Sequence, residues 1–276
     1  MGLTIHFKLK APAGTNAKEA QRLVIAARAI AVRSELEGRV QHVGELSADA
    51  RLLKRFATEY LSLPVPGEPN MFYSLEVAPL EGWLFVVNVG QDCEPLRFGL
   101  CRYPDTMMFR GREVRTKLGE GWRYWGFTKT QYASLHGWEH FLRCHRAVID
   151  LLAALRPLGF RVRISDEGEY WPRRSMPALR RNVGHMNALV AGMAGALKDA
   201  DDGEGAGIQS PIFAHKDFER LEAAGEARAG EVIRQARGVV SRLLRKPERY
   251  NHATRRTQRT IARDSLEAMA EGRSHA

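Results

Sequence analysis

Side chains capable of acid–base or nucleophilic chemistry are concentrated between residues 93 and 169. A thiol, an imidazole and a carboxylate together suit covalent catalysis, in which the imidazole activates the thiol and the carboxylate orients the imidazole. Negative charge beside Cys93 counts against this role, because it raises a thiol pKa. We expect Cys93 or Cys101, Cys144, His145, and Asp166 or Glu167 to line one pocket. The residues that we assign catalytic roles in it are Cys93, Lys129, His145, Asp166 and Glu167.

A metal site is a second interpretation of the same segment. Thiolate and imidazole ligands suit a tetrahedral zinc ion, and two ligands four residues apart on a helix can face one ion. The candidate ligands of zinc or another divalent metal are Cys93, Cys101, His140 and Cys144. The alternative is that these cysteines fill the core, as free cysteine commonly does.

A third interpretation is an anion site, because aromatic rings and basic side chains alternate along this segment. A ring can stack on a base while a cation holds phosphate. The candidate ligand-binding residues are Arg102, Trp125, Gln131 and Tyr132. In the alternative, the tryptophans pack in the core and the arginines cover it.

The composition narrows the classes of protein. A formal net charge of +10 attracts nucleic acid or another anionic ligand. Three cysteines do not make a disulfide framework, and no secretory leader or membrane-spanning run is apparent, so we expect a cytoplasmic protein with no membrane contact. The Gly-rich phosphate loop, the zinc-protease helix and the nucleophile elbow are all absent, which argues against the common enzymes that use them.

The elements that must position these residues follow from hydrophobic periodicity. Alternation of period two predicts strands at 3–9, 39–46, 73–77, 83–89, 96–101 and 160–164, and a hairpin at 106–110 and 113–117. Helical spacing predicts helices from a cap at Thr15 or Asn16 to residue 36, and at 50–61, 138–158 and 176–197. Residues 64–69 are rich in proline and predict a loop. This order indicates an α+β fold, a two-layer sandwich in which helices cover a largely antiparallel sheet.

The C-terminal part differs in composition from the rest. We expect a core domain at 1–199, a linker at 200–227 and a basic helical arm at 228–276. The apolar stripe of the helix at 228–246 predicts packing on the core, on a second copy of the chain or on another protein. Beyond it, four arginines recur at helical spacing and are candidates for phosphate contacts: Arg255, Arg256, Arg259 and Arg263.

Several short motifs in the first 200 residues resemble a family of uncharacterised bacterial proteins. These are the N-terminal MGLTIH, then FGLCRYP, KTQYAS, FLRCH and SDEG. The resemblance supports a single core domain and leaves the basic arm outside it. It carries over no reaction and no catalytic residue.

The sequence leaves two functions open. In the first, the protein is an enzyme or a binding protein that acts on a phosphate-bearing ligand such as nucleic acid, through a polar pocket formed by the 93–169 region. In the second, it is a non-catalytic protein-interaction module whose basic arm contacts nucleic acid.

Overall fold

The computed structural model describes residues 3–66, 68–200 and 209–225. They form an α+β fold with a largely antiparallel six-stranded sheet, as the periodicity predicted. In chain order the strands and helices are β1 (Thr4–Lys10), α1 (Ala17–Leu36), β2 (His42–Val43), α2 (Ala50–Ala57), β3 (Glu59–Val65), β4 (Glu68–Val77), β5 (Glu81–Asn88), β6 (Leu96–Arg102), β7 (Thr106–Phe109), β8 (Arg112–Arg115), β9 (Arg123–Lys129), α3 (Trp138–Ala154), β10 (Arg161–Asp166) and α4 (Met176–Ala200). Short 3₁₀ turns are η1 (Gln131–His136), η2 (Arg156–Leu158) and η3 (Pro211–Ala214). None of the helices in the described residues is long and apolar enough to cross a membrane.

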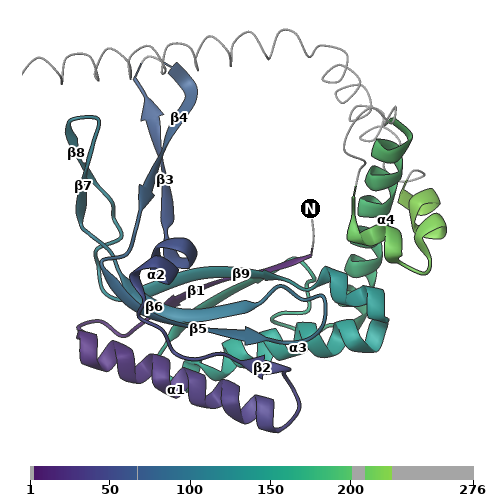
Figure 1. The fold of residues 1–276 in the computed structure, drawn as a ribbon, viewed down its shortest axis with the longest axis horizontal. Coiled ribbons are helices and arrows are strands. Elements are labelled where there is room, and N and C mark those ends of the chain that lie inside the picture. Colours follow the sequence, from purple (N-terminus) through teal and green to yellow (C-terminus); the bar gives the residue numbers. More distant parts are fainter. Residues whose placement is uncertain (1–2, 67, 201–208, 226–276) are drawn as a thin grey trace, which may run out of the picture. The chain divides into compact units, whose positions relative to one another are not determined.

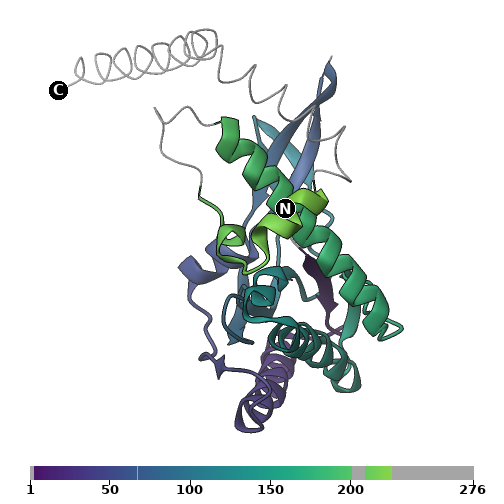
Figure 2. The ribbon, with the colours of Figure 1, turned by 90° about the vertical axis from the view of Figure 1, so that its right-hand side faces the viewer.

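The main sheet has the order β10-β1-β9-β6-β5-β2, so the first strand lies between two late ones. Strand β1 alternates as expected, with Ile5, Phe7 and Leu9 almost fully buried and Lys8 and Lys10 exposed. Helices α1 and α3 lie side by side against the buried face (Figures 1 and 2). The sheet and these two helices form the two layers of the sandwich.

Local sequence signals determine where the helices begin. Asn16 caps α1, since its side chain accepts the N–H of Glu19 while the Glu19 carboxylate accepts the N–H of Asn16. Asp49 caps α2 by accepting two backbone N–H groups. The caps satisfy donors that a helix leaves unpaired at its N-terminus.

Two β-ribbons extend from the side of the sheet opposite α1 (Figure 1). One pairs β3 with β4, and the other pairs β7 with β8. The ribbons touch where the Arg110 guanidinium donates a 2.9 Å hydrogen bond to the hydroxyl of Tyr73 and lies over its ring. The expected loop at residues 64–69 is therefore wrong. A two-stranded ribbon has free edges, which tolerate Pro64, and the register shifts directly after it.

Strand β9 is missing from the predicted order of elements. Its outward positions carry the large aromatic residues Trp125 and Phe127, whereas Gly126 occupies an inward position. A Cβ at Gly126 would lie 2.5 Å from the ring of Phe7, so this inward position has no room for an apolar side chain. The strand therefore lacks the usual contrast between an apolar inner face and a polar outer face. The strand expected at 39–46 is also shorter, because only His42–Val43 pair with β5.

The described chain divides into two compact units, with the boundary inside α4. The first contains residues 1–187 and 214–216, and the second contains the rest. Within the expected linker, residues 218–225 are helical and Leu221 is buried. The arm expected at 228–276 lies outside the described residues.

Candidate functional site

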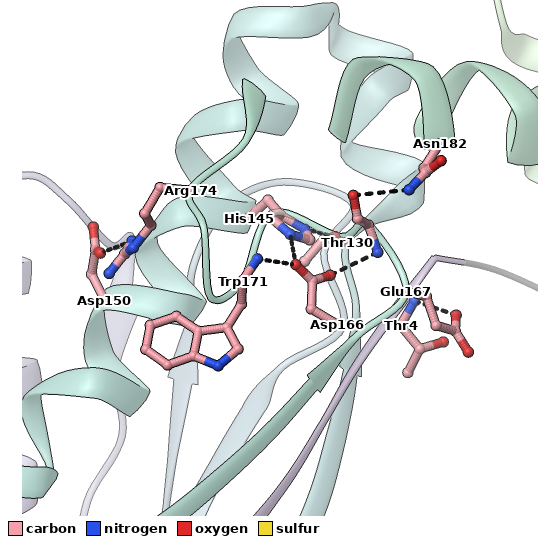
Figure 3. A network of polar contacts seen from close by, with 10 residues as sticks. Thr4, Thr130, His145, Asp150, Asp166, Glu167, Trp171, Arg174 and Asn182 are labelled. Atoms are coloured by element: carbon pink, nitrogen blue, oxygen red, sulfur yellow. Dashed lines mark hydrogen bonds and ion pairs between the residues drawn. The ribbon is translucent and has the colours of Figure 1, made fainter. Parts of the chain in front are cut away.

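A buried polar network joins the end of β9 to α3 and to the end of β10 (Figure 3). The imidazole of His145 lies between Thr130 and Asp166, with Nδ1 2.9 Å from the threonine Oγ1 and Nε2 3.3 Å from the aspartate Oδ2. An ionised carboxylate only accepts, so Nε2 carries the proton. In the neutral imidazole, Nδ1 then accepts the hydroxyl proton of Thr130. The order hydroxyl, imidazole, carboxylate is that of a catalytic relay.

Asp166 is held by more than the histidine. Its carboxylate also accepts the backbone N–H groups of Gly168 at 2.8 Å and Trp171 at 3.0 Å. Burial by itself raises the pKa of Asp166. The hydrogen bond with His145, the positive charge of that ring when it is protonated, and the two backbone donors outweigh burial, so the pKa of Asp166 lies below its usual value.

The network is sealed from solvent. The side chains of His145 and Asp166 both have 0% exposure, and Thr130 is equally buried. A catalytic group must reach its substrate, which these groups do not in this conformation. The arrangement supports a role in joining elements that are distant in the sequence. The catalytic roles predicted for His145 and Asp166 remain predictions, and their burial argues against them.

Two other predicted site residues, Glu167 and Gln131, make structural contacts. Glu167 accepts the N–H of Thr4 at 2.8 Å, on the neighbouring strand (Figure 3). Gln131 is fully buried, where it accepts the N–H of Leu3 and donates to Asn187, both at 3.0 Å. These bonds use both ends of the Gln131 amide. Because the side chain is also fully buried, a ligand does not reach it in this conformation.

Arg102, Tyr132 and Lys129 lie in separate surroundings. Arg102 is exposed at the end of β6, where it pairs with Glu81 at 2.7 Å. Tyr132 is half-buried in η1. The Lys129 Nζ is 3.4 Å from the Glu94 carboxylate and lies over the ring of Phe127. The structure therefore does not bring the four predicted ligand-binding residues together.

Cys93, in the loop between β5 and β6, lies against Cys144 of α3. The pKa of Cys93 is raised by its hydrogen bond with Cys144 and by burial, whereas the same bond lowers the pKa of Cys144. The His140 Nε2 lies 3.6 Å from the Cys144 Sγ and 2.9 Å from the carbonyl oxygen of Gln91. A side chain at Gly90 would clash with this thiol, since a Cβ there would lie 2.5 Å from Sγ. The raised pKa makes Cys93 a poor thiolate nucleophile at neutral pH.

Cys101 belongs to a different environment from the other two cysteines. It packs against Gly82 in the middle of the sheet, and burial followed by the charge of Glu59 raises its pKa to about 12. The described residues contain no group of three or more His, Cys, Asp or Glu placed to hold a metal ion. The metal site predicted from Cys93, Cys101, His140 and Cys144 is not assembled there. The sequence could not show that Cys101 lies apart.

Basic and aromatic side chains gather on the outer face of β10, β1 and β9, the side not covered by α1 and α3. We call this surface the open face. Its side chains stand in three rows across the strands, as the pairing register gives: Arg161, Lys10 and Arg123; Arg163, Lys8 and Trp125; Ser165, His6 and Phe127. Five of these nine residues are Lys or Arg.

Aromatic rings form one side of the open face. Trp125 and Phe127 are 40% and 42% exposed, unusual for side chains of this size. His6 lies beside both, with its ring 6.5 Å from that of Trp125 at an interplanar angle of only 12°, and 6.1 Å from that of Phe127. Glu167 approaches His6 at 3.6 Å. The rings therefore present an aromatic surface bordered by cations.

Sequence reasoning identified Trp125 but missed most of the open face. Lys8 and Lys10 alternate with buried residues in β1, and Arg161 and Arg163 do the same in β10. This alternation was available as a signal, but each strand alone resembles any half-exposed strand. Only the pairing of β1 with both β9 and β10 makes the rows. The predicted arm arginines, Arg255, Arg256, Arg259 and Arg263, lie outside the described residues.

Comparison of the chain with protein-family models, with curated protein sequences and with solved structures gave no match.

Proposed function

We propose that this protein binds single-stranded nucleic acid on the open face. The observation that carries the proposal is the register of β1, which places Lys8 beside Arg163 on one side and Trp125 on the other. A cation and an exposed ring in the same row can engage the phosphate and the base of one nucleotide. The next row repeats the pattern of a ring beside polar groups, with His6 between Phe127 and Ser165.

Charge favours a polyanion on this surface. The rows contain five Lys or Arg side chains, and the chain as a whole carries a formal net charge of +10. Backbone phosphates supply most of the affinity in non-specific binding of nucleic acid, and cations spaced along strands suit them. Two carboxylates adjoin the surface, Glu167 near His6 and Glu59 near Lys8.

The aromatic residues favour a single strand over a duplex. Bases in a duplex are stacked on one another and their faces are hidden, whereas unpaired bases can stack on exposed rings. Trp125 and Phe127 lie two residues apart on one strand, so their rings can contact successive bases. Stacking contributes about 1–3 kcal/mol per base.

The test is fluorescence anisotropy with labelled single-stranded RNA, single-stranded DNA and duplex DNA at several salt concentrations. We expect the single strands to bind more tightly than the duplex. In the variant Trp125→Ala with Phe127→Ala, the loss of two stacking contacts should weaken single-strand binding by at least tenfold. Comparison of the RNA and DNA probes determines which sugar the surface prefers.

A matched control is the variant Met71→Ala with Met108→Ala, which removes two exposed apolar side chains from the ribbons. Its affinity should equal that of the wild type. Two results would contradict the proposal. One is an equal loss of single-strand affinity in the two double variants, and the other is a wild-type affinity in the variant that lacks Trp125 and Phe127. So would a wild-type protein that binds none of the three probes.

A further inference from the structure

A hollow of about 420 Å³ opens at the edge of the open face, between β1, β9 and the start of β3. This volume is within the range of small-molecule sites, roughly 300–1,000 Å³. Trp125 lines it from β9 and Tyr60 from β3, with 40% and 63% of their surfaces exposed. Lys8, Lys10 and Arg123 line it as well.

Glu59 is the carboxylate in this hollow. Burial raises its pKa, and the positive charges of Arg123 and Lys8 offset only part of that effect. In the described part of the chain its carboxylate accepts no hydrogen bond and forms no ion pair. An unpaired, half-buried carboxylate is unfavourable, and a ligand with well-placed donors relieves it.

Arg123 is also incompletely satisfied. Its terminal nitrogens donate to the carbonyl oxygens of Glu120 and Lys117, but its buried Nε has no partner. These two bonds hold the guanidinium in place beside the hollow. The hollow therefore combines fixed positive charge, an unpaired acceptor and two exposed rings.

We propose that this hollow is a nucleobase subsite selective for guanine, with Glu59 accepting the base. The inference rests on the proposed function, because it assumes that a single strand lies on the open face. An ionised carboxylate is an acceptor with two oxygens, so it matches a ligand edge that presents two adjacent donors. Guanine presents N1–H and N2–H₂ side by side on its Watson–Crick edge.

The other bases do not present this pattern. The donor of adenine or cytosine on that edge adjoins a ring nitrogen acceptor, and the single donor of uracil lies between two carbonyl acceptors. Each of these acceptors would face a carboxylate oxygen and repel it. Trp125 or Tyr60 can stack on the guanine ring, and Lys8 and Lys10 lie where they can hold the adjoining phosphate.

The experiment uses the full chain and RNA nonamers of uridine with one central guanosine, inosine, adenosine or cytidine. Inosine lacks only the N2 amino group of guanosine. We expect the guanosine probe to bind about tenfold more tightly than the adenosine and cytidine probes. The inosine probe should be intermediate.

The variant Glu59→Gln should lose the preference for guanosine, so that its affinities for the guanosine, adenosine and cytidine probes agree within about threefold. Glu81→Gln also removes one negative charge, but from a residue that lies outside the hollow and pairs with Arg102. This control should keep the preference.

Two outcomes would overturn the subsite while the proposed function stands. One is a wild type that binds all four probes equally, and the other is a preference for guanosine that persists in Glu59→Gln. The comparison of guanosine with inosine uses only wild-type protein, so it does not depend on the folding of any variant. If no probe binds at all, the proposed function fails and the subsite fails with it.

Discussion

The open face and the Thr130–His145–Asp166 network both draw on strands β9 and β10, yet they differ in exposure and in how far their polar groups are paired. Outer residues of β1, β9 and β10 form the first, and residues at or after the ends of β9 and β10 contribute to the second. The network has the residue types of a catalytic relay, and its His145 and Asp166 side chains are 0% exposed and satisfied by each other and by their neighbours. The open face has ordinary surface residue types, but its aromatic groups are exposed, and within the described residues most of its cations form no ion pair. Residue type alone therefore did not identify the surface that we propose as the binding site.

The largest expected effect is on stability. Asp166→Ala removes the acceptor of His145, Gly168 and Trp171 and leaves these buried donors unpaired. We expect the free energy of unfolding to fall by about 3 kcal/mol and the melting temperature by on the order of 10 °C. Thermal denaturation measures both, and the binding of single strands by the folded fraction should not change.

The control for this variant is Asp150→Ala. Asp150 pairs with Arg174, but both side chains are partly exposed, so the pair contributes about 0–1 kcal/mol. If the two variants lower the free energy of unfolding equally, the buried network stabilises the fold no more than an exposed ion pair does. An Asp166→Ala protein with wild-type stability and lost binding would place Asp166 in the functional site.

The second effect is on binding. The double charge reversal Lys8→Glu with Arg163→Glu changes one row of the open face. Loss of two phosphate contacts should reduce the log–log salt slope of single-strand binding by about 1.4 and weaken binding more than tenfold at low salt. Anisotropy titrations at several salt concentrations measure the slope.

The variant Lys18→Glu with Arg22→Glu has the same net charge and changes two exposed residues of α1, which lies on the other side of the sheet. It should bind nearly as well as the wild type. If its slope falls as much as that of the first variant, the general charge of the protein is responsible and the open face has no privileged role.

The pH dependence of stability gives a smaller effect that sharpens the account of the network. Because the pKa of Asp166 is lowered in the folded protein, its charged form stabilises the fold above the unfolded pKa, which is about 4. That contribution is lost as the pH falls through the lower, folded value. The stability difference between wild type and Asp166→Asn should be constant from neutral pH to about 5 and shrink below about 4. A difference that grows on acidification would mean that the pKa is raised instead.

The smallest effect concerns His6, whose ring lies beside Trp125 and Phe127. His6→Ala should weaken single-strand binding by about 0.5–1 kcal/mol, because it removes a neighbour that orients the two rings. The exposed His42, on β2 at the other edge of the sheet, provides the control variant His42→Ala. Equal affinities of the two variants would remove His6 from the open face.

Hydrophobic spacing and capping in the sequence were sufficient for most of the fold. The Asn16 cap and the apolar stripe predicted α1, and strict alternation predicted β1, because these signals depend on residues a few positions apart. The same rules failed at β9, where a glycine faces the core and a tryptophan faces outward, and at Pro64, where a ribbon with free edges accepts a proline. At those positions the secondary structure is decided by contacts with distant strands, which the local sequence pattern does not show.

The sequence by itself determined which chemical groups the chain carries and roughly which elements hold them. Only the tertiary structure decided which of those groups meet solvent and which meet each other. Asp166 is 21 residues from His145, and the pairing of β1 with β9 joins Lys8 to Trp125 across more than a hundred residues. The exposure of a side chain and the identity of its hydrogen-bonding partners depend on such long-range contacts. For this reason the sequence pointed to His145 as a reactive group, whereas the structure points to the lysines, arginines and rings of the open face.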